Sequence, residues 1–364
     1  MAEVVSGSVV ARLLAGAWRT APPPLEVDAE ALAEAVPRIV APGAAALVWR
    51  RIAAGPLVAD PRLVPLRTAA VSGALANAAR LDRFRPLVRE LEAAGVVPVL
   101  FKGLALAGAY PGPNLRPLGD FDLVVRAADH ARAVDVLSRG ATEQSLPHEG
   151  QFRYAGLSAG MPGAAVDLHG GLPAAYGLAP DSLFGEAVAL GVGADVRVLA
   201  PRPEHHLRLV AMHMLRHGGW RPLWLVDVAA LVETAGPGFD WDEALGRDPL
   251  ARAWTATAIG LAATLLDCRP PAGVAMPPPA WVVRAVLAEW CDPRAARFLS
   301  PAVEFSPGFV RRRLASYWIN PVAAAIARGV PPSVSSPRAV QTAHFAASVA
   351  RAALKAASGR GWRP

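Results

Sequence analysis

The stretch Leu-Gly-Asp-Phe-Asp-Leu-Val-Val at residues 118–125 joins two acidic side chains to an uninterrupted apolar run. The apolar run predicts a buried β-strand. Because side chains alternate between the two faces of a strand, Asp120 and Asp122 point to the same side and Phe121 points to the other. Two carboxylates this close repel each other, so one of them would tend to keep a proton. A divalent cation between them removes that cost, and Mg²⁺, or Mn²⁺, suits hard oxygen ligands.

A third carboxylate follows in Val-Asp-Leu-His at residues 166–169, which predicts another buried strand. If this strand lies beside that of Asp122, Asp167 joins Asp120 and Asp122 around one or two metal ions. Such a site suits metal-assisted phosphoryl or nucleotidyl transfer, because the metals neutralise phosphate charge and lower the pKa of an attacking hydroxyl. An Asp-x-Asp pair alone is weak evidence, since surface turns often contain one. His169 shares the face of Asp167 and is compatible with a contact to substrate phosphate or with a packed, hydrogen-bonded histidine.

Lys102 and Gly103 follow the apolar run at residues 97–101, which predicts a strand, and they open a short predicted helix. Glycine lets the backbone approach a phosphate, the N-terminus of a helix attracts anions, and Lys102 adds a positive charge. A simple turn with a solvated lysine fits the same residues. Arg116, four residues before Asp120, is placed to reach a triphosphate, although a single arginine in an arginine-rich chain is weak evidence.

Other polar side chains lie in the second half of the chain. His206, His213 and His217 fall on roughly one face of a predicted helix. The spacing of the last two permits zinc binding, but the glutamate of a zinc-protease helix is missing, so a helix face that lines a cleft is the favoured interpretation. Asp227 lies among apolar residues and is expected to pair with a histidine or an arginine.

The order of predicted elements indicates a small α/β or α+β module between two helical regions. Residues 1–95 have mainly helical periodicity, residues 97–170 alternate short strands with helices, and the chain after residue 200 is helical again. We expect four parts: an N-terminal helical region at 1–80, a catalytic core at 81–200, a C-terminal helical domain at 201–358 and a disordered tail at 359–364.

The composition narrows the function classes. The chain has 364 residues and a net charge of +7, nearly all of it from arginine, because lysine occurs only at positions 102 and 355. This charge is compatible with binding of a polyanion, but an arginine-rich coding bias explains part of it. The two cysteines form no Cys-x-x-Cys or Cys/His pattern, so we expect neither a structural zinc site nor a disulfide.

Two further features bear on location and partners. The most apolar window, residues 253–266, is shorter than the ~20 residues of a membrane span and predicts a buried helix. The N-terminus shows no signal-peptide pattern, so a cytoplasmic location is expected. The basic stretch at 311–318 and the final helix could meet RNA or an anionic membrane, but aromatic residues are few and a solvated helical face is favoured.

Several segments together resemble the uncharacterised nucleotidyltransferase family of the polymerase-β-like superfamily. They are Phe-Lys-Gly-Leu-Ala-Leu-Ala-Gly-Ala-Tyr at 101–110, Asn-Leu-Arg-Pro-Leu-Gly-Asp-Phe-Asp-Leu-Val-Val at 114–125, a helix that ends near Gly140, and Val-Asp-Leu-His-Gly-Gly-Leu at 166–172. The resemblance covers about residues 80–235 and includes the histidine-bearing segment 205–233. It implies an α+β fold: a small mixed sheet with helices on one side, flanked here by N- and C-terminal helical regions.

The resemblance also implies residue roles and an activity. Asp120 and Asp122 would ligate the metal, and Asp167 would be the third carboxylate and a candidate base. Lys102 and Gly103 stand where many members of the wider superfamily have Gly-Ser. The implied reaction transfers a nucleoside monophosphate from an NTP to an acceptor, which could be a small molecule or a peptide in natural-product biosynthesis.

Two alternatives stay open. One is a catalytically silent nucleotide-binding or regulatory module, and the other is a toxin–antitoxin type nucleotidyltransferase that acts on tRNA or protein. The acceptor, the preferred nucleobase and the oligomeric state are also open, and nucleic acid is a possible but not a favoured partner.

Overall fold

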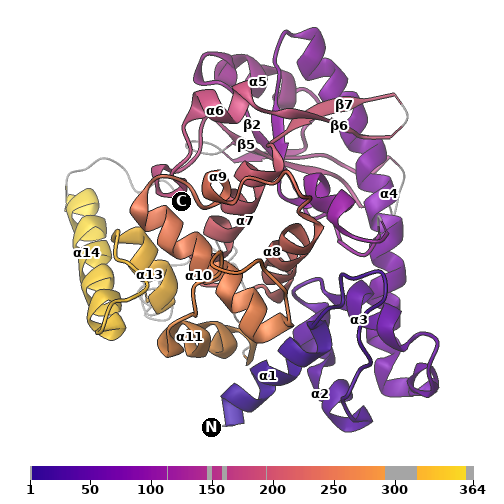
Figure 1. The fold of residues 1–364 in the computed structure, drawn as a ribbon. Helices are drawn as coiled ribbons and strands as arrows, with labels where there is room; N and C mark the ends of the chain where they lie inside the picture. The colour runs from indigo at the N-terminus through magenta and orange to yellow at the C-terminus, as the bar shows by residue number, and fades with distance from the viewer. Residues whose placement is uncertain are drawn as a thin grey trace.

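A seven-stranded mixed sheet forms the centre of the upper part of the molecule in the computed structural model (Figure 1). The structure describes residues 2–112, 114–145, 150–157, 162–193, 195–291 and 318–357. Its strands are β1 (Val99–Phe101), β2 (Phe121–Val124), β3 (Glu143–Ser145), β4 (Gly150–Arg153), β5 (Ala165–His169), β6 (Val188–Gly191) and β7 (Arg197–Ala200). They lie in the order β3-β4-β5-β2-β1-β7-β6, with β2 parallel to β5, β1 parallel to β7 and the other pairs antiparallel.

The predicted α+β class, with a small mixed sheet between helical regions, is confirmed. The sequence predicted the strands that became β1, β2 and β5. A further strand expected at residues 152–157 overlaps β4, which ends at Arg153, and β3, β6 and β7 were missed. Strand β3 consists of three exposed polar residues, Glu143–Ser145, and carries no apolar alternation. Most of β6 is exposed as well, so neither strand gives the hydrophobic pattern from which strands are recognised.

The central strands have two different faces. On one face, Leu100, Phe121, Leu123 and neighbouring apolar side chains form a buried core with α4 (Val64–Ala93) and α5 (His130–Ser138). This face is dry and apolar because every second residue of each strand points to it. The opposite face faces the C-terminal helices, and it is the face that carries the carboxylates.

The helical regions at the two ends of the chain share one core. The N-terminal helices are α1 (Ala2–Leu14), α2 (Ala29–Val40) and α3 (Ala45–Ile52), and the C-terminal ones are α7 (Pro203–Arg216), α8 (Pro222–Thr234), α9 (Trp241–Leu245), α10 (Pro249–Leu266), α11 (Ala280–Cys291), α13 (Pro321–Ala327) and α14 (Pro337–Ala357). Buried side chains of both sets belong to a single hydrophobic cluster. In Figure 1, α1 lies against the lower C-terminal helices, where it contacts α11.

The expected domain boundary between residues 80 and 81 falls inside α4, which is continuous over 30 residues. Figure 1 shows this helix running from α3 up along the sheet, so the N-terminal helical region and the core share it. The remaining short elements are α6 (Pro180–Gly185) and the 3₁₀ helices η1 (Pro56–Ala59), η2 (Pro61–Leu63), η3 (Gly103–Ala109), η4 (Ala127–Asp129) and η5 (Ala174–Tyr176).

Two sequence predictions concern the apolar and basic segments. The predicted buried helix at 253–266 is part of α10, whose middle is buried on several sides. Among the helices described, none is long and apolar enough to cross a membrane. Nearly all of the basic stretch at 311–318 and all of the tail at 359–364 lie outside the described residues.

Candidate active site

Three carboxylates gather on the sheet face that looks toward the C-terminal helices. Asp122 on β2 lies directly opposite Asp167 on β5, and the two strands are parallel neighbours. Adjacent strands are about 4.8 Å apart, and directly opposed residues share a face. Asp120 comes two residues before Asp122, immediately ahead of β2, so its side chain points to the same side. The strand of Asp167 therefore lies where the sequence reasoning requires it.

Asp120, Asp122 and Asp167 form a carboxylate row, and further side chains flank the opposed pair Asp122 and Asp167 across the sheet. Phe101 on β1 is opposite Asp122, and Gln151 on β4 is opposite Asp167. The Gln151 Nε2 donates a hydrogen bond to Asp167 Oδ2 at 3.3 Å. The buried aromatic ring on one side and the amide on the other confine the carboxylates to a narrow band of the sheet.

Lys102 has an unusual backbone conformation just after β1. Its φ is 59° and its ψ is −163°, a region that only glycine occupies readily. Gly103 follows with a φ of 41°. The Lys102 amide is held by a hydrogen bond to His206 Nε2 at 3.1 Å. This geometry favours glycine, and it makes the lysine here a strained residue.

The Lys102 ammonium lies on the acidic row. Its Nζ is 2.6 Å from Asp122 Oδ1, and the pair is nearly buried, with side-chain exposures of 13% and 6%. His169 Nε2 is 3.5 Å from the same oxygen. Burial alone would raise the pKa of Asp122, but the Lys102 charge and hydrogen bonds from His169 and Lys102 outweigh it and lower that pKa. Asp122 is therefore ionised.

The other two carboxylates respond in the opposite direction. Burial, and then the charges of Asp120 and Asp122, raise the pKa of Asp167 to about 6. The pKa of Asp120 is also raised, by the protein that encloses its inner side and by the charge of Asp122, although its outer side is open to solvent. Clustered carboxylates with this mutual repulsion form a donor set that suits a hard divalent cation.

Within the described residues, no three His, Cys, Asp or Glu side chains are positioned to hold a metal ion together. The Lys102 ammonium is instead paired with Asp122 at hydrogen-bond distance. A metal ion at Asp122 would compete with this ion pair.

Arg116 lies near the Gly103 turn, and its guanidinium is bonded within the protein. It is buried, and its Nε and Nη2 donate to Asp227 Oδ1 and Oδ2 at 3.1 and 2.8 Å. The Tyr110 hydroxyl donates to the same carboxylate at 2.5 Å. The predicted pairing of Asp227 with an arginine or histidine is confirmed. Arg116 thus ties the loop before β2 to α8. Its remaining nitrogen, Nη1, donates to the Pro117 carbonyl at 3.0 Å, so the predicted contact with a phosphate would have to compete with these bonds.

Arg221, directly before α8, was not singled out from the sequence. Its Nε donates to the Pro42 carbonyl at 2.6 Å, and among the described residues its guanidinium has no carboxylate partner. Burial and the charge of Arg116 lower the pKa of Arg221 to about 10, against the attraction of Asp227 and Asp120. It is a cation with incompletely compensated charge on the Asp120 side of the site. The only available signal was its place in Trp-Arg-Pro-Leu-Trp, inside the segment that resembles the family.

Helix α7 covers the lysine with two histidines. His206 accepts from the Lys102 amide, and His213 Nδ1 lies 3.4 Å from Lys102 Nζ. His213 also packs edge-on against Trp224, with ring centroids 4.7 Å apart. These contacts place this face of α7 against Lys102. Among the described residues, no three His, Cys, Asp or Glu side chains are placed to hold a zinc ion.

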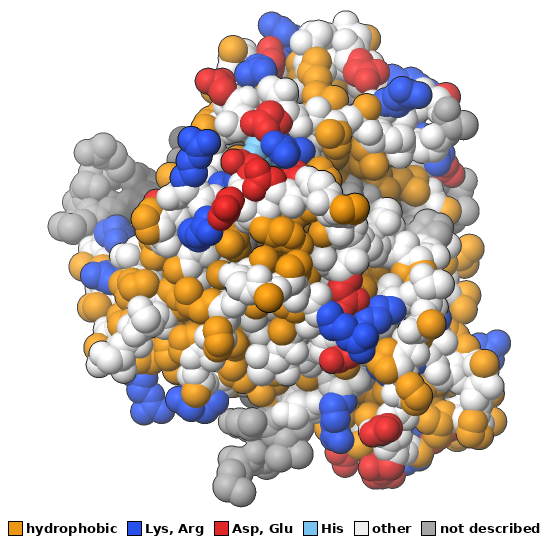
Figure 2. Space-filling model, in the orientation of Figure 1, with side chains coloured by type: hydrophobic (Ala, Val, Ile, Leu, Met, Phe, Trp, Pro, Cys, Tyr) orange, Lys and Arg blue, Asp and Glu red, His pale blue; other side chains and the backbone are white. Residues whose placement is uncertain are grey.

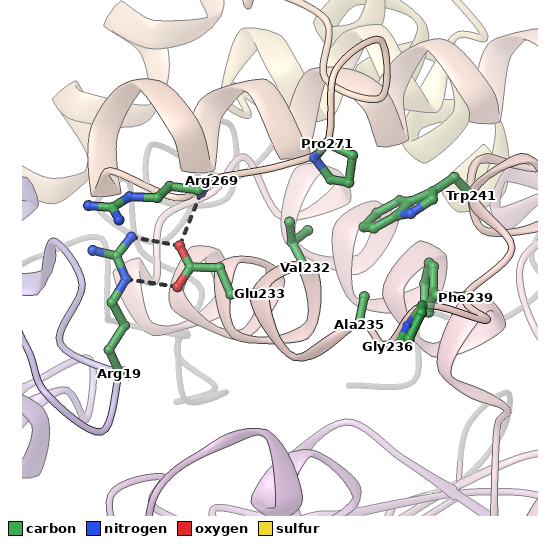
Figure 3. A pocket seen from close by; sticks show the side chains of 10 residues that line it. Arg19, Val232, Glu233, Ala235, Gly236, Phe239, Trp241, Arg269 and Pro271 are labelled. Atoms are coloured by element: carbon green, nitrogen blue, oxygen red, sulfur yellow. Dashed lines mark hydrogen bonds and ion pairs between the residues drawn. The ribbon is translucent and has the colours of Figure 1, made fainter.

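A hollow on the other side of the helical region has its polar groups already paired. Figure 3 shows Glu233 between Arg19 and the backbone of Arg269, with Phe239 and Trp241 on the far wall. The Glu233 carboxylate accepts from the Arg19 side chain at 2.6 and 2.8 Å and from the Arg269 amide at 3.0 Å. Glu233 lies at the C-terminal end of α8, twelve residues after Arg221, which is about 18 Å at 1.5 Å per residue. Its bonds to Arg19 and Arg269 join three segments of the chain, so we interpret this cluster as structural.

Charge on the surface is mixed rather than concentrated. On the face drawn in Figure 2, Lys and Arg side chains form separate patches among Asp and Glu side chains and hydrophobic surface. This face offers no continuous basic stripe of the kind that nucleic-acid binding uses.

Comparison with known proteins places the chain in a family. A structure of an antigenic nucleotidyltransferase-like protein from Paracoccidioides brasiliensis is similar over 56% of this chain and 97% of that one, with 14% identity and a TM-score of 0.39. No curated protein matches the chain. The family described as "Uncharacterised nucleotidyltransferase" matches residues 32–266, which is more than half of the 364 residues and contains the whole carboxylate row. The chain belongs to this uncharacterised nucleotidyltransferase family.

Proposed function

We propose that the protein transfers a nucleoside monophosphate from an NTP to a hydroxyl or phosphate acceptor, with Mg²⁺ or Mn²⁺ as cofactor. The observation that carries the proposal is the opposed pair of Asp122 and Asp167 on parallel neighbouring strands, with Asp120 on the same face and a lysine at the adjoining turn. Family membership supports an NTP as the donor. A small molecule or a peptide is the proposed kind of acceptor.

The metal would be held by Asp120, Asp122 and Asp167, whose carboxylate oxygens match the ligands that these cations prefer. When bound, it would neutralise phosphate charge and lower the pKa of the attacking hydroxyl. Asp167 is also the proposed acceptor of the proton of that hydroxyl, because it lies in register with Asp122 on the neighbouring strand. His169 would support Asp122, which it contacts.

The triphosphate would be bound by the cations around the row. Lys102 and the amide of Gly103 adjoin Asp122. We propose that Arg221 takes the part that the sequence assigned to Arg116, since the three guanidinium nitrogens of Arg116 already donate to Asp227 and to the Pro117 carbonyl. These groups would orient the α-phosphate for in-line attack, and pyrophosphate would leave toward the positive charge.

The test is transfer of label from each α-labelled NTP, with Mg²⁺ and cell extract, to any extract component. We expect Asp122→Asn to abolish both transfer and pyrophosphate release. Asp135→Asn is the matched control, because Asp135 is an exposed carboxylate on α5, on the opposite side of the sheet. Equal activity of the two variants, or a wild type that binds no NTP in the presence of Mg²⁺, would contradict the proposal.

One observation favours a second candidate function. The ion pair between Lys102 and Asp122 balances the charge of Asp122 without a metal ion, which fits a module that binds a nucleotide without turning it over. For such a module we expect NTP binding with neither transfer nor pyrophosphate release, and binding that survives in Asp122→Asn.

A further inference from the structure

Two histidines of α7 contact the two ends of the same lysine. His206 Nε2 accepts a hydrogen bond from the Lys102 amide at 3.1 Å, and His213 Nδ1 lies 3.4 Å from the Lys102 ammonium. The histidines are seven residues apart, which is two turns of helix and places them on one face. Lys102 therefore lies along the helix, with its backbone at one histidine and its charge at the other.

The chemistry of these contacts determines where each ring carries its proton. An amide N–H and an ammonium can only donate, so both ring nitrogens must accept. Burial, followed by the charge of Arg116, lowers the pKa of His206 to about 3, and burial followed by the charge of Lys102 lowers that of His213 far below its usual range. Both rings are thus neutral at pH 7. His206 must then carry its proton on Nδ1, and His213 must carry its proton on Nε2.

The contacts stabilise a residue whose backbone conformation is strained. Its φ of 59° and ψ of −163° belong to a region that side-chain-bearing residues rarely adopt. The His206 contact fixes the amide that this conformation exposes. Asp122 and His213 together fix the ammonium, one by charge at 2.6 Å and the other by its lone pair at 3.4 Å. Ordinary packing of a buried histidine would need neither acceptor nor a particular tautomer.

We infer that His206 and His213 are positioning residues that set the backbone and the ammonium of Lys102 for the triphosphate, and that they do so as opposite neutral tautomers. The placement of Lys102 stands on the contacts above. Its consequence for catalysis rests on the proposed function.

The first test reads the placement without any activity. In protein labelled with ¹⁵N-histidine, the two rings are expected to show opposite tautomers at pH 7, assigned with His206→Gln and His213→Asn. The chain has only two lysines, so labelling of the lysine side chain gives two signals, and Lys355→Arg identifies that of Lys102. The Lys102 signal is expected to shift in His213→Leu and to stay close to wild type in His213→Asn. Identical tautomers of the two rings, or a Lys102 signal that is unchanged in His213→Leu, would overturn the inference.

The second test separates positioning from packing by rescue. Gln can place its carbonyl oxygen near the former Nε2 of His206, and Asn can place its own near the former Nδ1 of His213, whereas Leu fills either space without an acceptor. We expect each Leu variant to lose about tenfold in kcat/KM for the NTP, the effect of one lost hydrogen bond, and each amide variant to retain most of it. Thermal unfolding of all four variants controls for their folding.

The outcomes distinguish the two proposals. If the wild type transfers no label, the proposed function fails, and the tautomers and the Lys102 signal still decide the placement. If the wild type is active and the Leu variants are as active as the amide variants, the positioning role is wrong while the proposed function stands.

Discussion

The strained turn at Lys102 makes a quantitative prediction that depends on a single Cβ atom. Lys102→Gly and Lys102→Ala remove the same ammonium from Asp122, and they differ only in whether a side chain remains at a φ of 59° and ψ of −163°. A residue with a Cβ in this region costs ~1–3 kcal/mol. Glycine loses ~0.4–1 kcal/mol more than alanine through the entropy of the unfolded chain. The difference leaves the glycine variant more stable by about 1 kcal/mol, the reverse of the usual order of these two residues.

Urea unfolding of the two variants, followed by far-UV circular dichroism at pH 7, measures this difference directly. The comparison needs no assumption about the lost ion pair, because both variants lack it. Gly73 within α4 offers the control for the usual order, since Gly73→Ala is expected to stabilise the helix by about 1 kcal/mol at a site where an added Cβ meets nothing within 4 Å. If Lys102→Ala is as stable as Lys102→Gly or more so, the strain at this turn is not real.

Three further predictions follow from buried charges. Asp227→Leu leaves Arg116 buried without its partner and should lower the free energy of unfolding by about 3–5 kcal/mol in urea, whereas a loss below 1 kcal/mol would argue against the ion pair. The pKa of His206 is about 3 in the folded protein and 6.5 for an ordinary histidine. Its contribution to stability is therefore constant above pH 6.5 and falls by ~1.4 kcal/mol per pH unit below it. As the pH is lowered from 7 to 5, the urea midpoint should drop less in His206→Gln than in wild type. The pKa of Asp167 rises from 3.8 to about 6, so this group favours the folded state below pH 3.8 and loses that contribution as the pH rises through 6. Asp167→Asn should therefore raise the melting temperature at pH 8 without metal, and it should abolish any further rise with Mg²⁺ and NTP. An unchanged response to Mg²⁺ would show that Asp167 is not part of the metal site.

The carboxylate row was predictable because it obeys a short-range rule. Alternation within a strand places Asp120 and Asp122 on one face regardless of the rest of the chain. The position of Asp167 needed one further step, the adjacency of two strands that are about forty residues apart, and the register of Asp122 with Asp167 satisfies it. The α+β class followed from the same apolar runs.

The surroundings of the row were not predictable, because they depend on contacts between distant segments. Arg116 has a clear position in the sequence, but only the fold reveals that Asp227, 111 residues later, binds its guanidinium. The contacts of His206 and His213 with Lys102 likewise join residues more than a hundred positions apart. The exposed strands β3 and β6 give no apolar signal, and the sheet was therefore expected to be smaller than it is.

The central claim is that the three carboxylates hold a divalent cation beside a bound nucleotide. Crystals grown with Mn²⁺ and a non-hydrolysable NTP analogue test it most directly, because anomalous scattering locates the metal. The account predicts a peak about 2.1 Å from oxygens of Asp120, Asp122 and Asp167, with the Lys102 ammonium moved from Asp122 to a phosphate. A nucleotide bound with no metal at these residues, and with the Lys102–Asp122 pair intact, would contradict it.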